Sequence, residues 1–181
     1  LKNMAEEIAS KTETEVLAVR ADVTNSEDIK RFVQATYSKF GQIDILVNCA
    51  VNFVSGDFSE LTDEDWWNHF NTKVIGSVRF AQEVLPYMRR QKWGRIINMA
   101  GSAARSGGGT SGATNAAIIN FTKVLSNEVA RDGITVNALH PTTASATGGK
   151  LLRLEESARR QGVSIEEAQA EAARRLQEYA G

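Results

Sequence analysis

The side chains that could do chemistry gather between Gly94 and Pro141, a segment that combines apolar runs, a glycine-rich stretch and a long helical pattern. Ser102 and Ser111 offer hydroxyl groups, and Asn115 offers a neutral amide. A serine hydroxyl is too weakly acidic for general acid–base catalysis near neutral pH, and an amide has no charge that could change this. His140, of a type that titrates near neutrality, could act as a base or be a structural residue at a strand end.

The remaining candidate groups each have a structural alternative. The run Gly107–Gly109 could cradle a phosphate or serve as a flexible connector. Cys49 is predicted to be a small core residue, and His69 is predicted to lie on a helix surface. No cluster of residues has metal-ligand spacing, so the sequence predicts no metal ion.

Hydrophobic periodicity in the first half of the chain predicts a strand, a helix and a second strand. Residues 15–21 form a short β-prone run. The helix that follows is expected to begin with a capping box between Thr24 and Glu27 and to end at Gly41. Residues 43–48 are almost continuously apolar, which is typical of a strand covered on both faces.

Two long helices dominate the rest of the sequence. The first is capped near Thr62, and its apolar stripe has helical spacing. The stripe comprises Trp67, Phe70, Val74, Val78, Ala81 and Leu85. The second, over about 111–131, is apolar on more than one side, which predicts burial between two layers or against another subunit. It stops at Gly133, and strands are expected at 95–99 and 134–139.

This alternation of strands and helices predicts βαβ units, a parallel sheet and right-handed crossovers. The fold class is therefore α/β, a Rossmann-type doubly wound parallel sheet in three αβα layers, here truncated. No linker divides the chain, so 1–181 is predicted to be a single, incomplete domain. After Pro141 come two polar helices, the second opening with a capping box between Ser164 and Glu167.

The composition is that of an ordinary globular protein, with 42% hydrophobic and 24% charged residues. A net charge of −1 gives no electrostatic basis for binding nucleic acid or an anionic membrane. No apolar run approaches the roughly 20 residues of a membrane helix, and the N-terminus lacks a signal-peptide layout. The single cysteine excludes an intrachain disulfide and suits a reducing compartment, so the predicted location is the cytoplasm.

The chain resembles the short-chain dehydrogenase/reductase family over nearly its whole length, and five segments in order carry the resemblance. They are Asp22-Val23, Asn48-Cys49-Ala50-Val51, the helix that contains Asn71, Gly94–Ser102 and Gly133–Pro141. The resemblance implies an oxidoreductase that uses NAD or NADP on a carbonyl or alcohol substrate, similar to the 3-oxoacyl reductases. The alternative is a non-catalytic relative that binds a dinucleotide or serves as a scaffold.

The resemblance also implies a role for each matching residue. The Asp22 carboxylate, with Val23 beside it, would meet the adenine amino group, although Asp22 could also be a turn residue. Asn48, Cys49 and Ala50 would lie beneath the cofactor ribose. At the other end of the site, Pro141 and Thr142 would lie beside the nicotinamide.

The catalytic residues implied by the resemblance are Asn71, Ser102, Ser111 and Asn115. Asn71 would support a water relay or be an ordinary polar helix residue, and Ser102 would orient the substrate carbonyl or be a plain loop serine. Ser111 and Asn115 stand where the family has its Tyr-x-x-x-Lys pair, in which lysine lowers the tyrosine pKa and holds the ribose. Because the loop is shorter than usual, the family serine falls on Gly101 or Ser102.

Further departures concern the cofactor site and the ends of the chain. Val51 and Thr142 replace two glycines of the family pattern, and the glycine-rich pyrophosphate loop would precede Leu1. Both ends look cut, so this fragment alone is expected to be inactive. In the family sheet, the strand near 15–21 lies beyond two missing strands. It should therefore be detached from the 43–48 strand, which leaves an exposed parallel edge.

The resemblance also implies partners. The helices over 62–92 and 111–131 are expected to pair in a homodimer or homotetramer. Residues 148–181 are expected to form the helices of a substrate lid, because such insertions vary with specificity. No nucleic-acid or membrane partner is expected.

Overall fold

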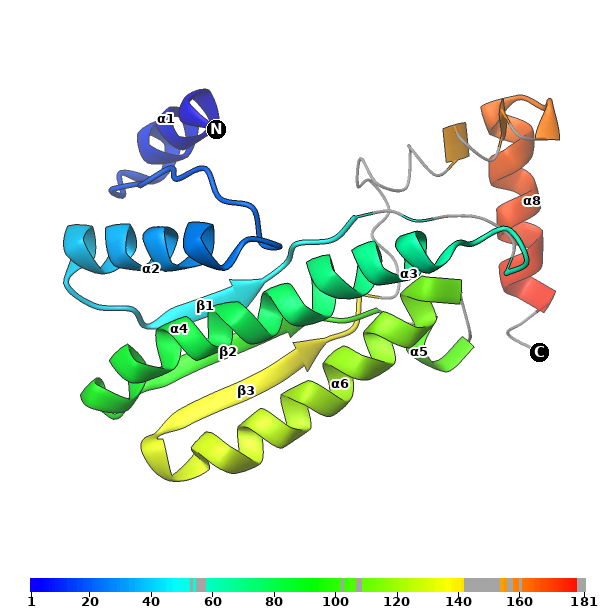
Figure 1. Ribbon diagram of the computed structural model, residues 1–181. Helices are drawn as coiled ribbons and strands as arrows, with labels where there is room; N and C mark the ends of the chain where they lie inside the picture. The colour runs from blue at the N-terminus through cyan, green and yellow to red at the C-terminus, as the bar shows by residue number, and fades with distance from the viewer. Residues whose placement is uncertain are drawn as a thin grey trace. The chain divides into compact units, whose positions relative to one another are not determined.

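The computed structural model describes residues 1–52, 54, 58–101, 103–106, 109–141, 154–155, 158–159 and 161–178. The chain divides into two compact units, Leu1–Pro141 and Thr142–Gly181 (Figure 1). The single domain expected over 1–181 stays a prediction. No helix in the described ranges is long and apolar enough to cross a membrane.

The first unit is built on a parallel sheet of three strands in the order β1-β2-β3. The strands are β1 (Ile45–Asn48), β2 (Gly94–Met99) and β3 (Ile134–Leu139). Their register pairs Ile45 with Arg95, and Gly94 with Ile134. Each strand is followed or preceded by a helix long enough for a crossover, so the predicted α/β class and parallel sheet are confirmed.

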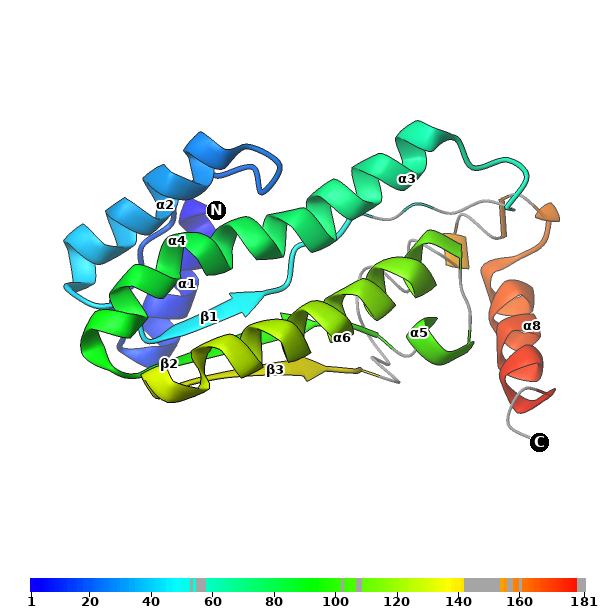
Figure 2. The same ribbon diagram turned by 60° about the horizontal axis from the view of Figure 1, so that its bottom comes forward.

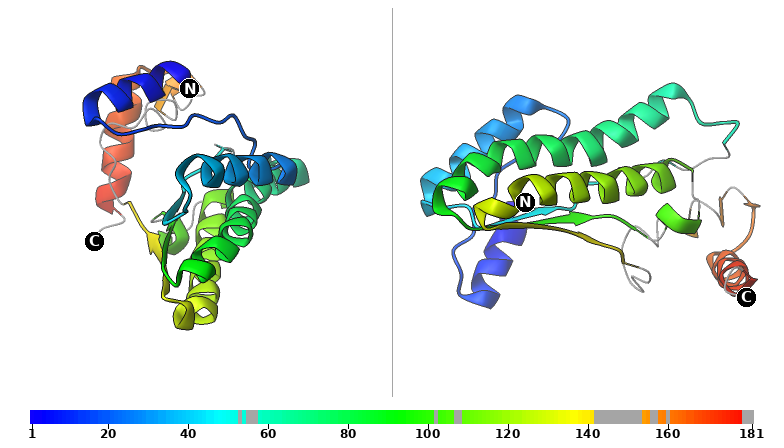
Figure 3. Two further views of the ribbon diagram at one scale, coloured as in Figure 1. Left: turned by 90° about the vertical axis from the view of Figure 1, so that its left-hand side faces the viewer. Right: turned by 90° about the horizontal axis from the view of Figure 1, so that it is seen from below.

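Three helices cover one face of the sheet (Figure 2). They are α2 (Ser26–Phe40), α4 (Gly76–Gln91) and α6 (Gly109–Val129), the last of which continues into η2 (Ala130–Asp132). Helix α1 (Lys2–Thr12) lies on the other side of the sheet plane and buries none of its residues (Figure 3). The layers are therefore those of a truncated doubly wound fold.

The predicted strand at 15–21 does not form, because no neighbouring strand lies beside it to complete a hydrogen-bonded ladder. Strand β1 pairs with β2 alone among the described residues, which leaves its other edge open. Ile45 and Val47 of this strand are 58% and 52% exposed. The expected separation of 15–21 from the 43–48 strand and the exposed parallel edge are both confirmed.

The N-cap of helix α2 is Asn25, one residue later than predicted. The side chain of Asn25 accepts hydrogen bonds from the amides of Glu27 and Asp28, so the capping box expected between Thr24 and Glu27 is wrong. Thr24 instead donates its amide and its hydroxyl to the Asp22 carboxylate, and these bonds lower the pKa of Asp22. The end of α2 at Gly41 is confirmed, with a φ of 74°.

The predicted cap at Thr62 is also confirmed, because Thr62 and Asp65 form a capping box at the start of α3 (Asp63–Phe70). The chain then passes through a π-helical turn, η1 (Asn71–Ile75), directly into α4. A π-helical turn inside a helix is rare, and where such turns occur they are frequently found at functional sites. It places the side chains of 71–75 differently from those of a continuous α-helix.

The core lies between the sheet and helices α2, α4 and α6. Its buried residues include Ile29, Met88, Ile96 and Val129. Most of the predicted stripe packs inward, but Trp67 is 63% exposed, so its place in the stripe is wrong. Trp67 belongs to the first turns of α3, away from the sheet. On α6 one predicted side is buried, as Ile118, Leu125 and Val129 show. The other side carries Val124, which is 58% exposed.

In the second unit, α8 (Ile165–Glu178) begins at the predicted capping box. The amide of Ser164 donates to Glu167, and the amide of Glu167 donates to the Ser164 hydroxyl oxygen. These bonds lower the pKa of Glu167. Much of the helix predicted before α8 lies outside the described residues, and the substrate-lid role of 148–181 stays a prediction.

Candidate active site

The candidate site lies where the three parallel strands end. All three strand arrows point toward the side of the first unit where α3 and the start of α6 lie (Figure 1). Ligands of open α/β sheets bind outside the carboxyl ends of the strands. The predicted residues of β1, β2 and β3 and those at the start of α6 are therefore brought to one end of this unit.

Two polar pairs join the α3–η1 segment to α6. His69 Nδ1 lies 2.8 Å from the hydroxyl oxygen of Thr110, and Lys73 Nζ donates to Asn115 Oδ1 over 2.5 Å. All four side chains are buried, with exposures between 1% and 9%. The prediction that His69 lies on a helix surface is therefore wrong, because this face of the helix packs on α6.

Asn115 also contacts the segment that leaves β2. A Cβ placed on Gly101 would lie 2.7 Å from Asn115 Nδ2, a separation that real Cβ atoms essentially never show. The backbone at Gly101 can approach the amide so closely only because residue 101 has no side chain. Gly101, Asn115 and Lys73 therefore form one connected cluster, which we call the Lys73 cluster. Its residues come from the segment after β2, from α6 and from η1.

The residues at the Tyr-x-x-x-Lys positions occupy the first turns of α6. Ser111 is half-buried, and Asn115 is 4% exposed. Thr114 donates its hydroxyl to the carbonyls of Thr110 and Ser111. Ser102, the other predicted catalytic hydroxyl, lies outside the described residues. The short helix α5 (Ala103–Ser106) follows it.

Asn71 is directed toward a different neighbour from Lys73. Its Oδ1 accepts a hydrogen bond of 2.9 Å from Arg79 Nη1, which also donates to the carbonyl of Val23 at 3.3 Å. The structure thus ties Asn71 to the loop before α2, whereas Lys73 contacts Asn115. The relay role of Asn71 stays a prediction.

Lys73 is the residue of this site that the sequence analysis missed. One signal could have indicated it: His69, Lys73 and Ser77 follow one another at intervals of four, so they share a helix face. All three are buried. A row of polar residues on one face of an apolar helix indicates polar partners on the neighbouring element.

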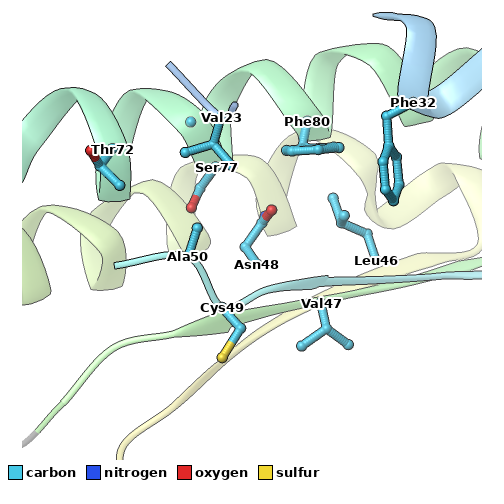
Figure 4. A pocket seen from close by; sticks show the side chains of 11 residues that line it. Val23, Phe32, Leu46, Val47, Asn48, Cys49, Ala50, Thr72, Ser77 and Phe80 are labelled. Carbon is cyan, nitrogen blue, oxygen red and sulfur yellow. The ribbon is translucent and has the colours of Figure 1, made fainter. Parts of the chain in front are cut away.

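A pocket of about 220 Å³ opens beside the end of β1 (Figure 4). Four predicted cofactor-binding residues line it: Val23, Asn48, Cys49 and Ala50. Figure 4 shows Asn48 and Ala50 pointing toward α4, where Ser77 also lies, while Cys49 points to the opposite face. Cys49 is exposed, so the prediction that it is a core residue is wrong. Strand alternation turns it away from the helices because its neighbour Asn48 faces them.

Asn48 belongs to a buried hydrogen-bond chain beneath the pocket, which we call the Asn98 network. Its Nδ2 donates to Asn98 Oδ1 over 2.8 Å, and Asn98 Nδ2 donates to the Thr122 hydroxyl oxygen over 2.9 Å. Thr122 in turn donates to the carbonyl of Ile118 over 2.7 Å. The network joins the ends of β1 and β2 to α6, so it holds in place Asn48, which lines the pocket.

The remaining predicted residues lie at the edges of the site. Asp22 is exposed next to Val23, and its pKa is lowered, so its carboxylate is ionised and accessible near neutral pH. His140 and Pro141 are exposed just after β3, and Thr142 lies outside the described residues. Within the part of the chain that the structure describes, no group of three or more His, Cys, Asp or Glu residues could hold a metal ion.

Comparisons with known proteins agree on one fold and one family. Residues 1–156 match the sequence profile described as short chain dehydrogenase. The chain is 33% identical over 141 residues to a 3-oxoacyl-(acyl-carrier-protein) reductase of Staphylococcus epidermidis, which covers 76% of this chain and 57% of that protein. A reductase of the same name from Synechocystis is 35% identical over 130 residues, 70% of this chain and 53% of that protein.

A solved structure shows the same similarity. L-Sorbose reductase from Gluconobacter frateurii, crystallised with NADPH and L-sorbose, superposes with a TM-score of 0.83 at 30% identity. The match covers 92% of this chain and 64% of that one. The chain therefore spans about half the length of the curated relatives it matches.

Proposed function

We propose that this chain, which belongs to the short chain dehydrogenase family, is part of an NAD(P)-dependent oxidoreductase. The proposed substrate is a carbonyl or an alcohol. The observation that carries the proposal is the family match over residues 1–156, which includes all three strand ends that form the candidate site. The two 3-oxoacyl reductases among its relatives support a carbonyl substrate of that kind.

The described residues fit a dinucleotide at the adenine side of the site. The accessible Asp22 carboxylate can accept a hydrogen bond from an adenine amino group. Val23 and Ala50 offer apolar contacts at the pocket, and Asn48 and Cys49 would lie beneath the ribose. A Cβ on Gly76 would lie 3.1 Å from Val23 Cβ, so this glycine keeps Val23 and α4 close together. Pro141 and Thr142 are the residues proposed beside the nicotinamide.

The nicotinamide, when bound, supplies the hydride. The protein must then orient the substrate and give a proton to its oxygen. Ser102 is proposed to orient the carbonyl, and Asn71 to hold a water of the proton relay. Ser111 and Asn115 cannot perform tyrosine–lysine chemistry, so His140 or a water is proposed as the proton source.

The second candidate function is a non-catalytic dinucleotide-binding or scaffold protein. It is favoured by the same two substitutions, because Ser111 has a weakly acidic hydroxyl and Asn115 has no charge. A measurement of turnover separates the two candidates, because only the oxidoreductase needs a proton source and converts a substrate.

Consumption of NADPH or NADH by the full-length protein tests the proposed activity. With a 3-oxoacyl thioester as substrate, we expect absorbance at the reduced-nicotinamide band to fall, at a rate about 10²-fold or more below that of a family member with Tyr and Lys. The variant S111A should keep this slow rate, because Ser111 is not its proton source. Cofactor binding without any turnover across a panel of carbonyls would favour the scaffold function.

We also propose that the protein forms a homodimer or homotetramer through α4 and α6. A surface groove of about 300 Å³ runs between these helices. Most of its lining residues are apolar, among them Phe121 and Val124, and Gln82, Arg89 and Glu128 add polar groups. Light scattering should give the mass of a dimer or tetramer for the full-length protein. The variant V124E should shift it toward the monomer, because the charge would be buried at the interface. A monomeric wild type would contradict this.

Two further assignments stay proposals. The helices over 148–181 are proposed to cover the substrate, by analogy with the family's variable insertion. The cytoplasm is the proposed location, because a single cysteine suits a reducing compartment.

A further inference from the structure

The strongest unassigned feature of the molecule is the buried ammonium group of Lys73. This side chain is 9% exposed, yet it carries a charge whose burial is costly unless it is hydrogen-bonded. Asn115 Oδ1 accepts one of its hydrogen bonds at 2.5 Å. A well-packed apolar residue of similar volume is often no less stable than a buried charged group, so stability alone does not explain a lysine here.

The position of Lys73 is set by the local backbone. It lies in the π-helical turn η1, and its own carbonyl accepts a hydrogen bond of 2.6 Å from the Ser77 hydroxyl. The ammonium therefore crosses from this turn to α6, where it meets the neutral side chain of Asn115. In this contact η1 contributes the charged residue, Lys73, and α6 contributes its neutral partner, Asn115.

The contact also fixes the orientation of the Asn115 amide. Because Oδ1 accepts from Lys73, the Nδ2 group is directed to the other side, where it lies against the backbone at Gly101. The Lys73 cluster thus brings a positive charge to the end of β2, where the candidate catalytic loop begins. An apolar residue at position 73 would leave Asn115 Oδ1 without this donor, and a lysine at position 115 would bring two positive charges together.

A dinucleotide reductase benefits from a cation at this place. The cofactor carries a negative diphosphate and hydroxyl-rich ribose groups, and hydride transfer places negative charge on the carbonyl oxygen. A fixed positive charge in a water-poor site stabilises both more than it would in water. Neither Ser111 nor Asn115 can supply that charge.

We infer that Lys73 is the cation of this active site and promotes cofactor binding from η1, with Asn115 as the residue that positions it. This inference rests on the proposed function. Position 115 is where the family pattern has its lysine. In this chain the charge resides instead at position 73, and the amide lies at position 115. A protein with the two residue types exchanged should keep the charge in nearly the same place.

Calorimetric titration of NADPH and NADH into full-length variants tests the inference. We expect K73M to weaken binding of the preferred cofactor at least 10-fold. The exchanged variant K73N/N115K should bind within about 3-fold of wild type. The control K123M, which removes an exposed lysine of α6, should bind within 2-fold. Circular dichroism establishes that each variant is folded, and K73Q replaces K73M if the latter is not.

The outcomes separate the two claims. Equal affinity of wild type and folded K73M would overturn the inference and leave the proposed function standing. A folded K73N/N115K that binds no better than K73M would overturn it as well. If wild type binds neither nucleotide, the proposed function fails, and the inference falls with it. The single variant N115K should be less stable to heat than K73N/N115K, because it places two ammonium groups in contact.

Discussion

The substitution G133A is expected to lower the free energy of unfolding by about 2–5 kcal/mol. Gly133 has a φ of 73°, a left-handed conformation that costs a residue with a side chain about 1–2 kcal/mol. A Cβ on it would also lie 2.2 Å from the carbonyl oxygen of Lys92. That atom is backbone, so the turn itself must move, which costs roughly another 1–3 kcal/mol. Denaturant unfolding measures the change.

A matched control separates these two costs. Gly41 has a φ of 74° and no atom within 4 Å of the place where a Cβ would lie. G41A should therefore lose only about 1–2 kcal/mol, the conformational part of the cost. Equal losses in G41A and G133A would show that the close approach to Lys92 is not what requires glycine at 133.

The substitution N98L is expected to cost about 3 kcal/mol of unfolding free energy. Asn98 is fully buried, and leucine of similar size would remove the two hydrogen bonds that Asn98 makes to Asn48 and Thr122. The Nδ2 group of Asn48 would lose its acceptor, and Thr122 would lose its donor. Each buried group left without a partner costs roughly 1–3 kcal/mol. Urea unfolding, monitored by circular dichroism, gives the value.

The control for this prediction is N137L, at an exposed position of the neighbouring strand β3. A surface change of this kind should alter stability by no more than about 0.5 kcal/mol. N98L should also weaken cofactor binding, because it removes the hydrogen-bond partner of Asn48, which lines the pocket. If N98L were as stable as N137L, the buried network would not hold the strand ends.

The parts of the fold that the sequence predicted correctly depend on local signals. Gly41 and Gly133 adopt the left-handed conformation that ends a helix. Thr62 forms a capping box with Asp65 at the start of α3. The three strands of the sheet are apolar runs of ordinary length. Such signals act within a few residues, so they do not require knowledge of the partner segments.

The errors arise where a distant or competing partner decides the outcome. Residues 15–21 have the composition of a strand but no neighbour with which to pair. Thr24 binds Asp22, so Asn25 takes over the cap of α2. His69 is buried because α6 packs on its face of α3, which the spacing within α3 alone does not reveal.

The candidate site was predictable to the extent that it follows strand ends. Val23, Asn48 and Ala50 do line one pocket. The contact between Lys73 and Asn115 joins residues 42 positions apart, through a π-helical turn that has no simple sequence signature. Its energetics depend on burial, which only the packed structure shows.

The measurement that tests this account most directly is calorimetric titration of NADPH and NADH into the full-length protein. The account predicts saturable binding of at least one of them with a micromolar Kd, which corresponds to a binding free energy of about −8 kcal/mol. Binding of neither nucleotide would contradict it. The fold at the strand ends would then serve association or another ligand, not nicotinamide chemistry.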